Sequence, residues 1–153
     1  MQKMTLEQQL QQIVDDAANH GVPPAVITKA IAPVLRFYAE KLQNQNYYIL
    51  QNLESEWVLT TIFNSQLQQQ KKVIYAFVSV RDAAARGKID PSFIAVPISV
   101  VQLLFRLVSL QQVDSIIFLE DSTDSSVEVE RAALSQQIQQ QIEQLRSAPP
   151  HFA

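Results

Sequence analysis

The side chains most suited to chemistry are carboxylates gathered in one short acidic segment. The segment contains Glu120, Asp121, Asp124, Glu128 and Glu130. It directly follows an apolar stretch that we expect to form a strand, and open sheets often place ligand sites at strand ends. Carboxylate oxygens are the ligands that hard cations such as Mg²⁺ and Ca²⁺ prefer. Asp121, Asp124 and Glu128 therefore form a candidate divalent-metal or small-ligand site, on which a hydrolase could be built.

A second interpretation of the same carboxylates needs no ligand. We expect a helix to begin near residue 126, and acidic side chains near a helix N-terminus are stabilised by the helix dipole. The segment also lacks the alternating acidic residues and the glycine that define a calcium-binding loop. The spacing thus favours a structural role for these residues, with the metal site kept as the alternative.

Other residue types used in catalysis are rare in this chain. It has no Cys and only two His residues, His20 and His151. His20 precedes Gly21 where a helix should end, and the dipole favours an imidazole at that position. A catalytic base needs a partner and a pocket, and no G-x-S-x-G motif supplies a nucleophilic serine. These shortages predict a protein that is not an enzyme and that uses no cofactor.

Five aromatic residues lie on neighbouring expected strands: Tyr47, Tyr48, Trp57, Tyr75 and Phe77. Aromatic side chains on one face of a sheet can stack on RNA bases, but such modules combine them with basic residues. The first two expected strands carry no Lys or Arg. Packing in the core is therefore the favoured role of these aromatic side chains.

Composition and charge exclude further classes of function. Charged residues make up 18% of the 153 residues, below the usual ~25%, and the formal net charge is −3. Such a chain has little capacity to neutralise phosphates, so we expect no nucleic-acid partner. The first ten residues lack the apolar centre of a signal peptide, and the apolar stretch 96–110 is too short and too interrupted to span a bilayer. We expect a cytoplasmic protein without a membrane partner.

The chain should form one domain over residues 1–153, and it should open with a helical hairpin over 5–43. Thr5 and Gln8 match the reciprocal capping pattern of a helix start, and Gly21 suits a left-handed helix end. A second helix should follow Pro23, with a kink or a break at Pro33 because proline lacks a backbone donor.

After this hairpin the apolar period changes to two, which predicts strands over residues 46–120. We expect residues 47–51 and 57–63 to pair as an antiparallel hairpin, followed by a polar loop at 66–72. Further strands are expected at 73–78, 93–98 and 113–119, with short helices between them. A last helix should span 126–147. The predicted fold class is α+β, with one five-stranded mixed sheet between the N-terminal hairpin and the C-terminal helix.

The expected core follows from this arrangement of strands and helices. It consists of residues on the inward faces of the sheet and of the helix at 100–110: Ile49, Leu59, Ile74, Ala76, Val78, Ile94, Val96, Leu104, Leu107, Ile117 and Leu119.

The helix at 100–110 is apolar around most of its circumference, so nearly all of it must be covered. A sheet can cover one face, and the other face needs either another part of the chain or a partner. A partner surface would include the apolar residues Leu103, Leu107 and Leu110. Arg106 would lie at its rim, since arginine is enriched at protein interfaces. Both forms of cover stay open at this point.

The last helix carries only a thin apolar stripe, which includes Leu134, Ile138 and Ile142. Such a helix docks lightly on its own domain or lies against another protein. With the helix at 100–110, it predicts a small non-enzymatic binding, assembly or regulatory module. Its partner would be another protein or a second copy of the chain in a homodimer.

Short segments spread over most of the chain carry a resemblance: YYIL at 47–50, WVLTT at 57–61, IYAF at 74–77, DAA at 82–84 and VDSIIF at 113–118. They are similar to segments of a family of small uncharacterised cyanobacterial proteins. This resemblance implies a habitat and no particular activity.

A second resemblance covers the middle of the chain: YAFVS at 75–79, AVPI at 95–98, LL at 103–104 and VDSI at 113–116. These segments resemble the N-terminal domain of SseB-like proteins, which pairs a strand and a short helix with a V-P strand and an L-L helix. Those proteins usually continue with an Asn-Pro-Gly turn, whereas this chain has LEDS at 119–122. That departure puts a ligand role for the turn in doubt.

Overall fold

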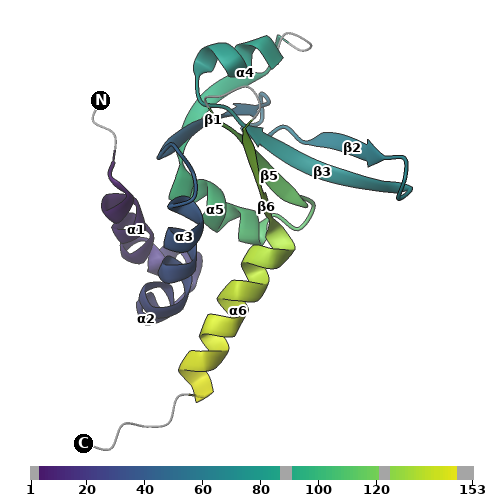
Figure 1. Cartoon of the computed structure of the whole chain (residues 1–153). Coiled ribbons are helices and arrows are strands. Elements are labelled where there is room, and N and C mark those ends of the chain that lie inside the picture. Colours follow the sequence, from purple (N-terminus) through teal and green to yellow (C-terminus); the bar gives the residue numbers. More distant parts are fainter. Residues whose placement is uncertain (1–3, 87–90, 121–124, 148–153) are drawn as a thin grey trace, which may run out of the picture.

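The N-terminal helices begin and end close to the expected residues. The computed structural model describes residues 4–86, 91–120 and 125–147, and its fold is α+β (Figure 1). Helix α1 (Leu6–Asp15) starts with the expected capping box. The Thr5 hydroxyl accepts from the Gln8 backbone N–H at 3.2 Å, and the Gln8 side chain accepts from the Thr5 N–H at 2.9 Å. Gly21 has a φ of +67°, which confirms its left-handed conformation.

The expected break at Pro33 is present as a widened helical turn. A short 3-10 helix, η1 (Ala17–His20), is followed by α2 (Pro24–Val26), the π-helical turn η2 (Ile27–Ile31) and α3 (Ala32–Ala39). The nitrogen of Pro33 cannot donate to the carbonyl four residues earlier, and a π turn accommodates that missing bond. The expected helical hairpin therefore consists of α1 against an irregular second arm.

The strands form two sheets, which corrects the expected single five-stranded sheet. Strand β1 (Asn46–Gln51) pairs with β4 (Ile94–Ser99) in an antiparallel ribbon. The second sheet has the order β2-β3-β5-β6, in which only β3 and β5 are parallel. Its strands are β2 (Thr60–Asn64), β3 (Gln69–Ala76), β5 (Ser115–Leu119) and β6 (Ser126–Glu130). The two sheets meet at one bridge, where Tyr48 and Phe77 exchange backbone hydrogen bonds of 2.7 and 2.8 Å.

The expected hairpin of residues 47–51 with 57–63 is present only at its turn, where the Asn52 N–H donates to the Glu56 carbonyl and the Val58 N–H to the Leu50 carbonyl, both at 2.9 Å. Strand β1 touches that region only at the Gln51–Trp57 bridge, and β2 instead pairs with β3. The turn between β2 and β3 is made by Asn64, whose side chain accepts from the backbone N–H groups of Gln66 and Leu67 at 3.0 and 3.2 Å. Gln68 completes the turn with a φ of 53°, so strand β3 already begins inside the segment expected to be a polar loop.

Residues 126–130 form strand β6, and the last helix α6 (Arg131–Ser147) begins five residues later than expected. The sequence SVEVE alternates polar and β-branched residues, which is a strand pattern. Val129 is buried against the core, while Glu128 and Glu130 point to the other face. The alternation of polar and β-branched side chains therefore forms a strand here, and the helix begins only at Arg131.

Helix α5 (Val100–Ser109) lies at the centre of the main core. Buried side chains of the four-stranded sheet belong to the same core. Helices α1, α3 and α6 lie against α5 (Figure 1). A smaller cluster around Leu50, Phe77 and Ala83 packs helix α4 (Val80–Arg86) against the β1–β4 ribbon. The β2–β3 hairpin extends away from this body (Figure 1).

The core prediction is confirmed for five residues and is wrong for Leu59 and Ile94, which are exposed. The buried members are Ile49, Ile74, Ala76, Leu104 and Leu107. Val78, Val96, Ile117 and Leu119 are only partly buried. Leu59 and Ile94 are 37% and 54% exposed, because Leu59 enters the projecting hairpin and Ile94 lies at the start of β4.

Candidate functional site

The residues expected to bind a partner divide into a buried group and an accessible group. Leu103, Leu107, Leu134 and Ile138 are buried in the main core, so a partner cannot contact them in this fold. Their apolar faces are covered by the chain itself, because α1, α3 and α6 pack around α5. The partner surface predicted from α5 and α6 is thereby narrowed to its accessible members, which are Arg106, Leu110 and Ile142.

Arg106 lies over an aromatic ring in the lining of a groove. It sits in the last turn of α5, whose start is set by the Ser99 hydroxyl accepting from the Gln102 N–H at 3.3 Å. The guanidinium carbon lies 4.2 Å from the centroid of the Trp57 ring. Trp57 is held in turn by its bridge to Gln51 at the end of β1. Stacking of this kind contributes about 0.5–2 kcal/mol and fixes the direction of the guanidinium.

The groove beside this pair has a volume of about 510 Å³. Leu59 from the entry to β2 and Leu110 from the end of α5 supply accessible apolar surface, and Glu56 also lines the groove. Within the described part of the chain, no carboxylate pairs with the Arg106 guanidinium. The groove can therefore take an apolar side chain together with an anionic group that pairs with Arg106.

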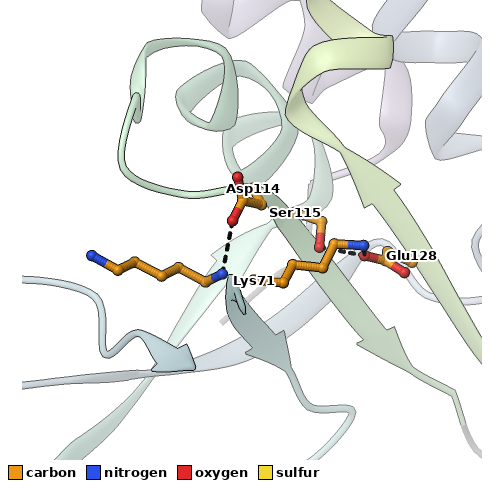
Figure 2. Close-up of polar contacts among 5 residues, drawn as sticks. Lys71, Asp114, Ser115 and Glu128 are labelled. Carbon is orange, nitrogen blue, oxygen red and sulfur yellow. Dashed lines mark hydrogen bonds and ion pairs between the residues drawn. The ribbon is translucent and has the colours of Figure 1, made fainter. Parts of the chain in front are cut away.

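A second groove, of about 530 Å³, lies on the open face of the four-stranded sheet and is lined by charged residues. Figure 2 shows that Lys71 of β3 and Glu128 of β6 reach toward each other across β5 and form an ion pair. The Ser115 hydroxyl of β5 donates to the same Glu128 carboxylate at 2.6 Å. These contacts tie three strands together, and Ser115 is buried, so this serine is not placed to attack a substrate.

The structure describes only part of the acidic segment. Asp121 and Asp124 lie outside the described residues, so the metal site that includes them stays a prediction. Glu128 is already engaged by Lys71 and Ser115. Among residues 4–86, 91–120 and 125–147, no group of three or more His, Asp or Glu side chains is arranged to hold a metal ion. Glu130 lies on β6 and faces Ser115 of β5 in the pairing register.

Glu120 has a role that the sequence did not indicate. Its side chain is only 6% exposed and accepts a hydrogen bond of 2.8 Å from the Tyr47 hydroxyl. The side-chain amide of Asn44 donates to its other oxygen at 3.3 Å. Burial, followed by the bond to Glu120, raises the pKa of Tyr47 well above its ordinary value, so the hydroxyl stays protonated and donates. The carboxylate thus anchors the start of β1 to the end of β5.

A second buried polar residue, Gln9, was also missed. Its side-chain amide donates to the carbonyls of Met4 and Gln45 at 3.2 and 3.0 Å. Its side-chain oxygen accepts from the Val101 backbone N–H at 3.2 Å, in the first turn of α5. Gln9 of α1 therefore caps the first turn of α5, although the two helices are far apart in the sequence. The only sequence signal for this role is a glutamine at a position adjacent to the apolar stripe of α1.

The remaining candidate residues do not form a site among the described residues. His20 ends the short helix η1, and His151 lies outside the described residues. Of the five aromatic residues, Tyr47 and Trp57 belong to the main core and Phe77 to the second cluster. Tyr48 and Tyr75 pack on that second cluster. The five side chains are thus shared between two cores instead of forming one exposed face, which supports the packing role.

We expect the Lys71–Glu128 pair to add to stability only above acidic pH. Burial alone raises the pKa of Glu128, but hydrogen bonds from Lys71 and Ser115 outweigh it, and the net pKa lies below the ordinary value. A lowered folded-state pKa means that the stabilisation is present at neutral pH and is lost as the pH falls through that pKa. Since both side chains are partly exposed, the contribution is about 1 kcal/mol or less.

Urea unfolding of Glu128→Gln and of the parent protein between neutral and acidic pH tests this expectation. The two stabilities should differ at pH 7 and converge in acid, whereas the exposed turn variant Glu54→Gln should follow the parent throughout. A difference that persists unchanged into acid would contradict the expectation.

Comparison with models of known protein families gives no match, and comparison with curated proteins gives none either. None of the helices in the described residues is long and apolar enough to cross a membrane.

Proposed function

We propose that this protein is a non-enzymatic binding module, and that it recognises a segment of another protein through the groove beside Arg106 and Trp57. One observation carries the proposal. A guanidinium without a carboxylate partner in the described chain is held over an indole ring, next to accessible leucine side chains at the groove. Binding a peptide in this groove does not require the catalytic residue types that are rare in this chain.

The chemistry of the groove supports a particular kind of segment. Tryptophan and arginine are the residues that most often contribute strongly to binding at protein interfaces. Because Arg106 is already oriented by Trp57, less side-chain entropy is lost when it pairs with a carboxylate. Leu59 and Leu110 offer contact to an aliphatic or aromatic side chain. The segment we infer is therefore a short peptide that carries Asp or Glu close to a large apolar residue.

A library of random peptides displayed on phage and selected on the full chain tests this proposal. We expect enriched peptides that combine an acidic and a large apolar residue. Arg106→Ala should weaken their binding about tenfold or more, which corresponds to about 1.4 kcal/mol. Arg81→Ala is the matched control, since Arg81 is an exposed arginine of α4 that does not line the groove. Failure to enrich any peptide, or equal binding by Arg106→Ala, would refute the proposal.

The alternative is a divalent-metal or small-ligand domain that uses Asp121, Asp124 and Glu128. It has weaker support, because the Glu128 carboxylate is engaged by Lys71 and Ser115. The cytoplasmic location and the two family resemblances remain predictions that accompany this proposal. The binding chemistry of the groove depends on none of them.

A further inference from the structure

Strand β2 forms one edge of the four-stranded sheet, and it lacks the features that normally protect such an edge. An edge strand presents unpaired backbone groups, which proteins usually shield with charged side chains, proline or bulges. The sequence of β2 is TTIFN, with no charge and no proline. Its pairing with β3 runs in continuous register from Thr60 to Asn64, without a bulge.

The other strand edges in the described part of the chain are protected. Strand β6, at the opposite end of the same sheet, carries Glu128 and Glu130. In the β1–β4 ribbon, Pro97 lies opposite Tyr48, whose own N–H and C=O bond to Phe77. Pro97 is therefore in a non-hydrogen-bonded pair, and its missing N–H falls on the outer side of β4. The lack of protection at β2 is thus particular to that strand.

The backbone geometry shows which groups of β2 are free. The N–H of Lys72 in β3 donates to the Asp114 side chain, and its C=O accepts from the Asp114 N–H, both at 2.8 Å. Lys72 therefore points its backbone groups toward β5. Because directions alternate along a strand, its neighbours in β3 bond to β2, and their partners there are Thr60 and Ile62. Thr61, and the residues two before and two after it, direct their N–H and C=O groups outward.

We propose that β2 pairs antiparallel with β2 of a second copy of this chain, about a two-fold axis that places Thr61 opposite Thr61. The outward backbone groups of the two strands then meet as hydrogen-bonded pairs. This register also places Leu59 of each copy opposite Phe63 of the other, which gives two equivalent pairs. These side chains are 37% and 55% exposed in the single chain. Aliphatic–aromatic pairs across strands are favourable, and no like charges face each other in the paired segments.

The second copy would also extend the groove of the proposed function. Leu59 lines that groove, so Phe63 of the second copy lies at its margin and enlarges the apolar surface. The pairing itself does not use Arg106, which belongs to α5. The Arg106→Ala variant should therefore remain a dimer while it loses the peptide, and the two inferences can fail separately.

Light scattering over a wide range of protein concentration tests the pairing. The parent should have twice the mass of the chain. Thr61→Lys places two lysines opposite each other at the axis and should raise the dissociation constant at least about tenfold, since like charges directly opposite are unfavourable. Thr61→Val keeps a neutral β-branched residue and should remain a dimer. The Thr61 side chain is exposed, so Thr61→Val should unfold in urea as the parent chain does once dissociation is accounted for. Thr61→Lys also faces Lys72 of its own chain across the β2–β3 pairing, so it should unfold at a lower urea concentration than Thr61→Val.

A single introduced cysteine tests the register, because the chain has no Cys of its own. Residues in a hydrogen-bonded antiparallel pair have Cα atoms about 5.5 Å apart, within the range that a disulfide spans. Thr61→Cys should therefore form a covalent dimer when oxygen with copper–phenanthroline oxidises the two thiols. Phe63→Cys should not, because the two copies of that residue lie more than about 10 Å apart in this register. A monomeric parent, a Thr61→Lys dimer as tight as the parent, or equal cross-linking of both cysteine variants would overturn the proposal.

Discussion

Replacement of Gln9 by leucine is expected to lower the free energy of unfolding by about 2–4 kcal/mol, although it makes a buried side chain more apolar. The Gln9 side chain is almost fully buried, and its amide donates two hydrogen bonds and accepts one. Leucine has a similar volume but forms no hydrogen bonds, so the backbone groups that bond to the Gln9 amide lose that partner. A polar group that loses its partner in the interior costs about 1–3 kcal/mol.

The most costly loss is the bond from the Val101 N–H. This group lies in the first turn of α5, where backbone donors have no partner within the helix, and Val101 itself is buried. Gln45 is affected less, because its carbonyl keeps the bond from the Val100 N–H at 2.9 Å. The effect should therefore be concentrated at the junction between α1 and the start of α5.

Urea unfolding with equal denaturant slopes measures the change directly. Gln12→Leu is the matched control, since it makes the same substitution at an exposed position of the same helix and should alter stability by about 0.5 kcal/mol or less. Hydrogen exchange should show earlier opening of α5 in Gln9→Leu. A Gln9→Leu variant as stable as Gln12→Leu would show that the buried amide is not a structural clamp.

Removal of the Tyr47 hydroxyl should lower stability by about 2–3 kcal/mol, as expected for a hydrogen bond to a buried charged group. Tyr47→Phe keeps the ring, including its edge-to-face contact with Phe118 at 4.9 Å between centroids. The variant leaves the Glu120 carboxylate in the interior with only Asn44 as a side-chain donor in the described chain. The cost therefore comes from the unmatched carboxylate and not from lost packing.

A double-mutant cycle with Glu120→Gln separates these two causes. The amide of glutamine can still accept from the Tyr47 hydroxyl and carries no charge, so it tolerates the loss of that donor better. We expect Tyr47→Phe to cost about 1–2 kcal/mol less in the Glu120→Gln background. Tyr48→Phe is the control on the same strand, because no hydrogen bond to the Tyr48 hydroxyl is present among the described residues. Additive effects in the cycle would contradict the proposed contact.

Local patterns predicted the helix ends well because their causes lie within a few residues. The Thr5–Gln8 capping box and the left-handed Gly21 are confirmed. Each depends on contacts between near neighbours in the chain, so the sequence contains all of their partners. The strand at 126–130 was not predicted although its alternation is equally local, because five residues directly before a helix can also be read as the first turns of that helix.

Strand pairing was predicted less well because it joins residues that are far apart in the chain. Strand β1 pairs with β4 across more than forty residues, and the choice between β4 and β2 depends on how the chain turns at Asn52 and Asn64. The candidate groove shares this limit. Arg106 and Leu110 were singled out from helical spacing, but nothing in the sequence pattern brings Trp57 or Leu59 to them.

The sequence by itself determined that this protein has an α+β composition of elements, that α5 must be covered on nearly every side, and that few catalytic side chains are present. Those conclusions follow from residue types and from short-range periodicity. Only the tertiary structure decided that the chain itself covers α5, that Gln9 and Glu120 are buried with their partners, and that β2 is left as an unprotected edge. The physical reason is that cover, burial and edges are properties of contacts between distant segments, and periodicity reports only which side of an element avoids water.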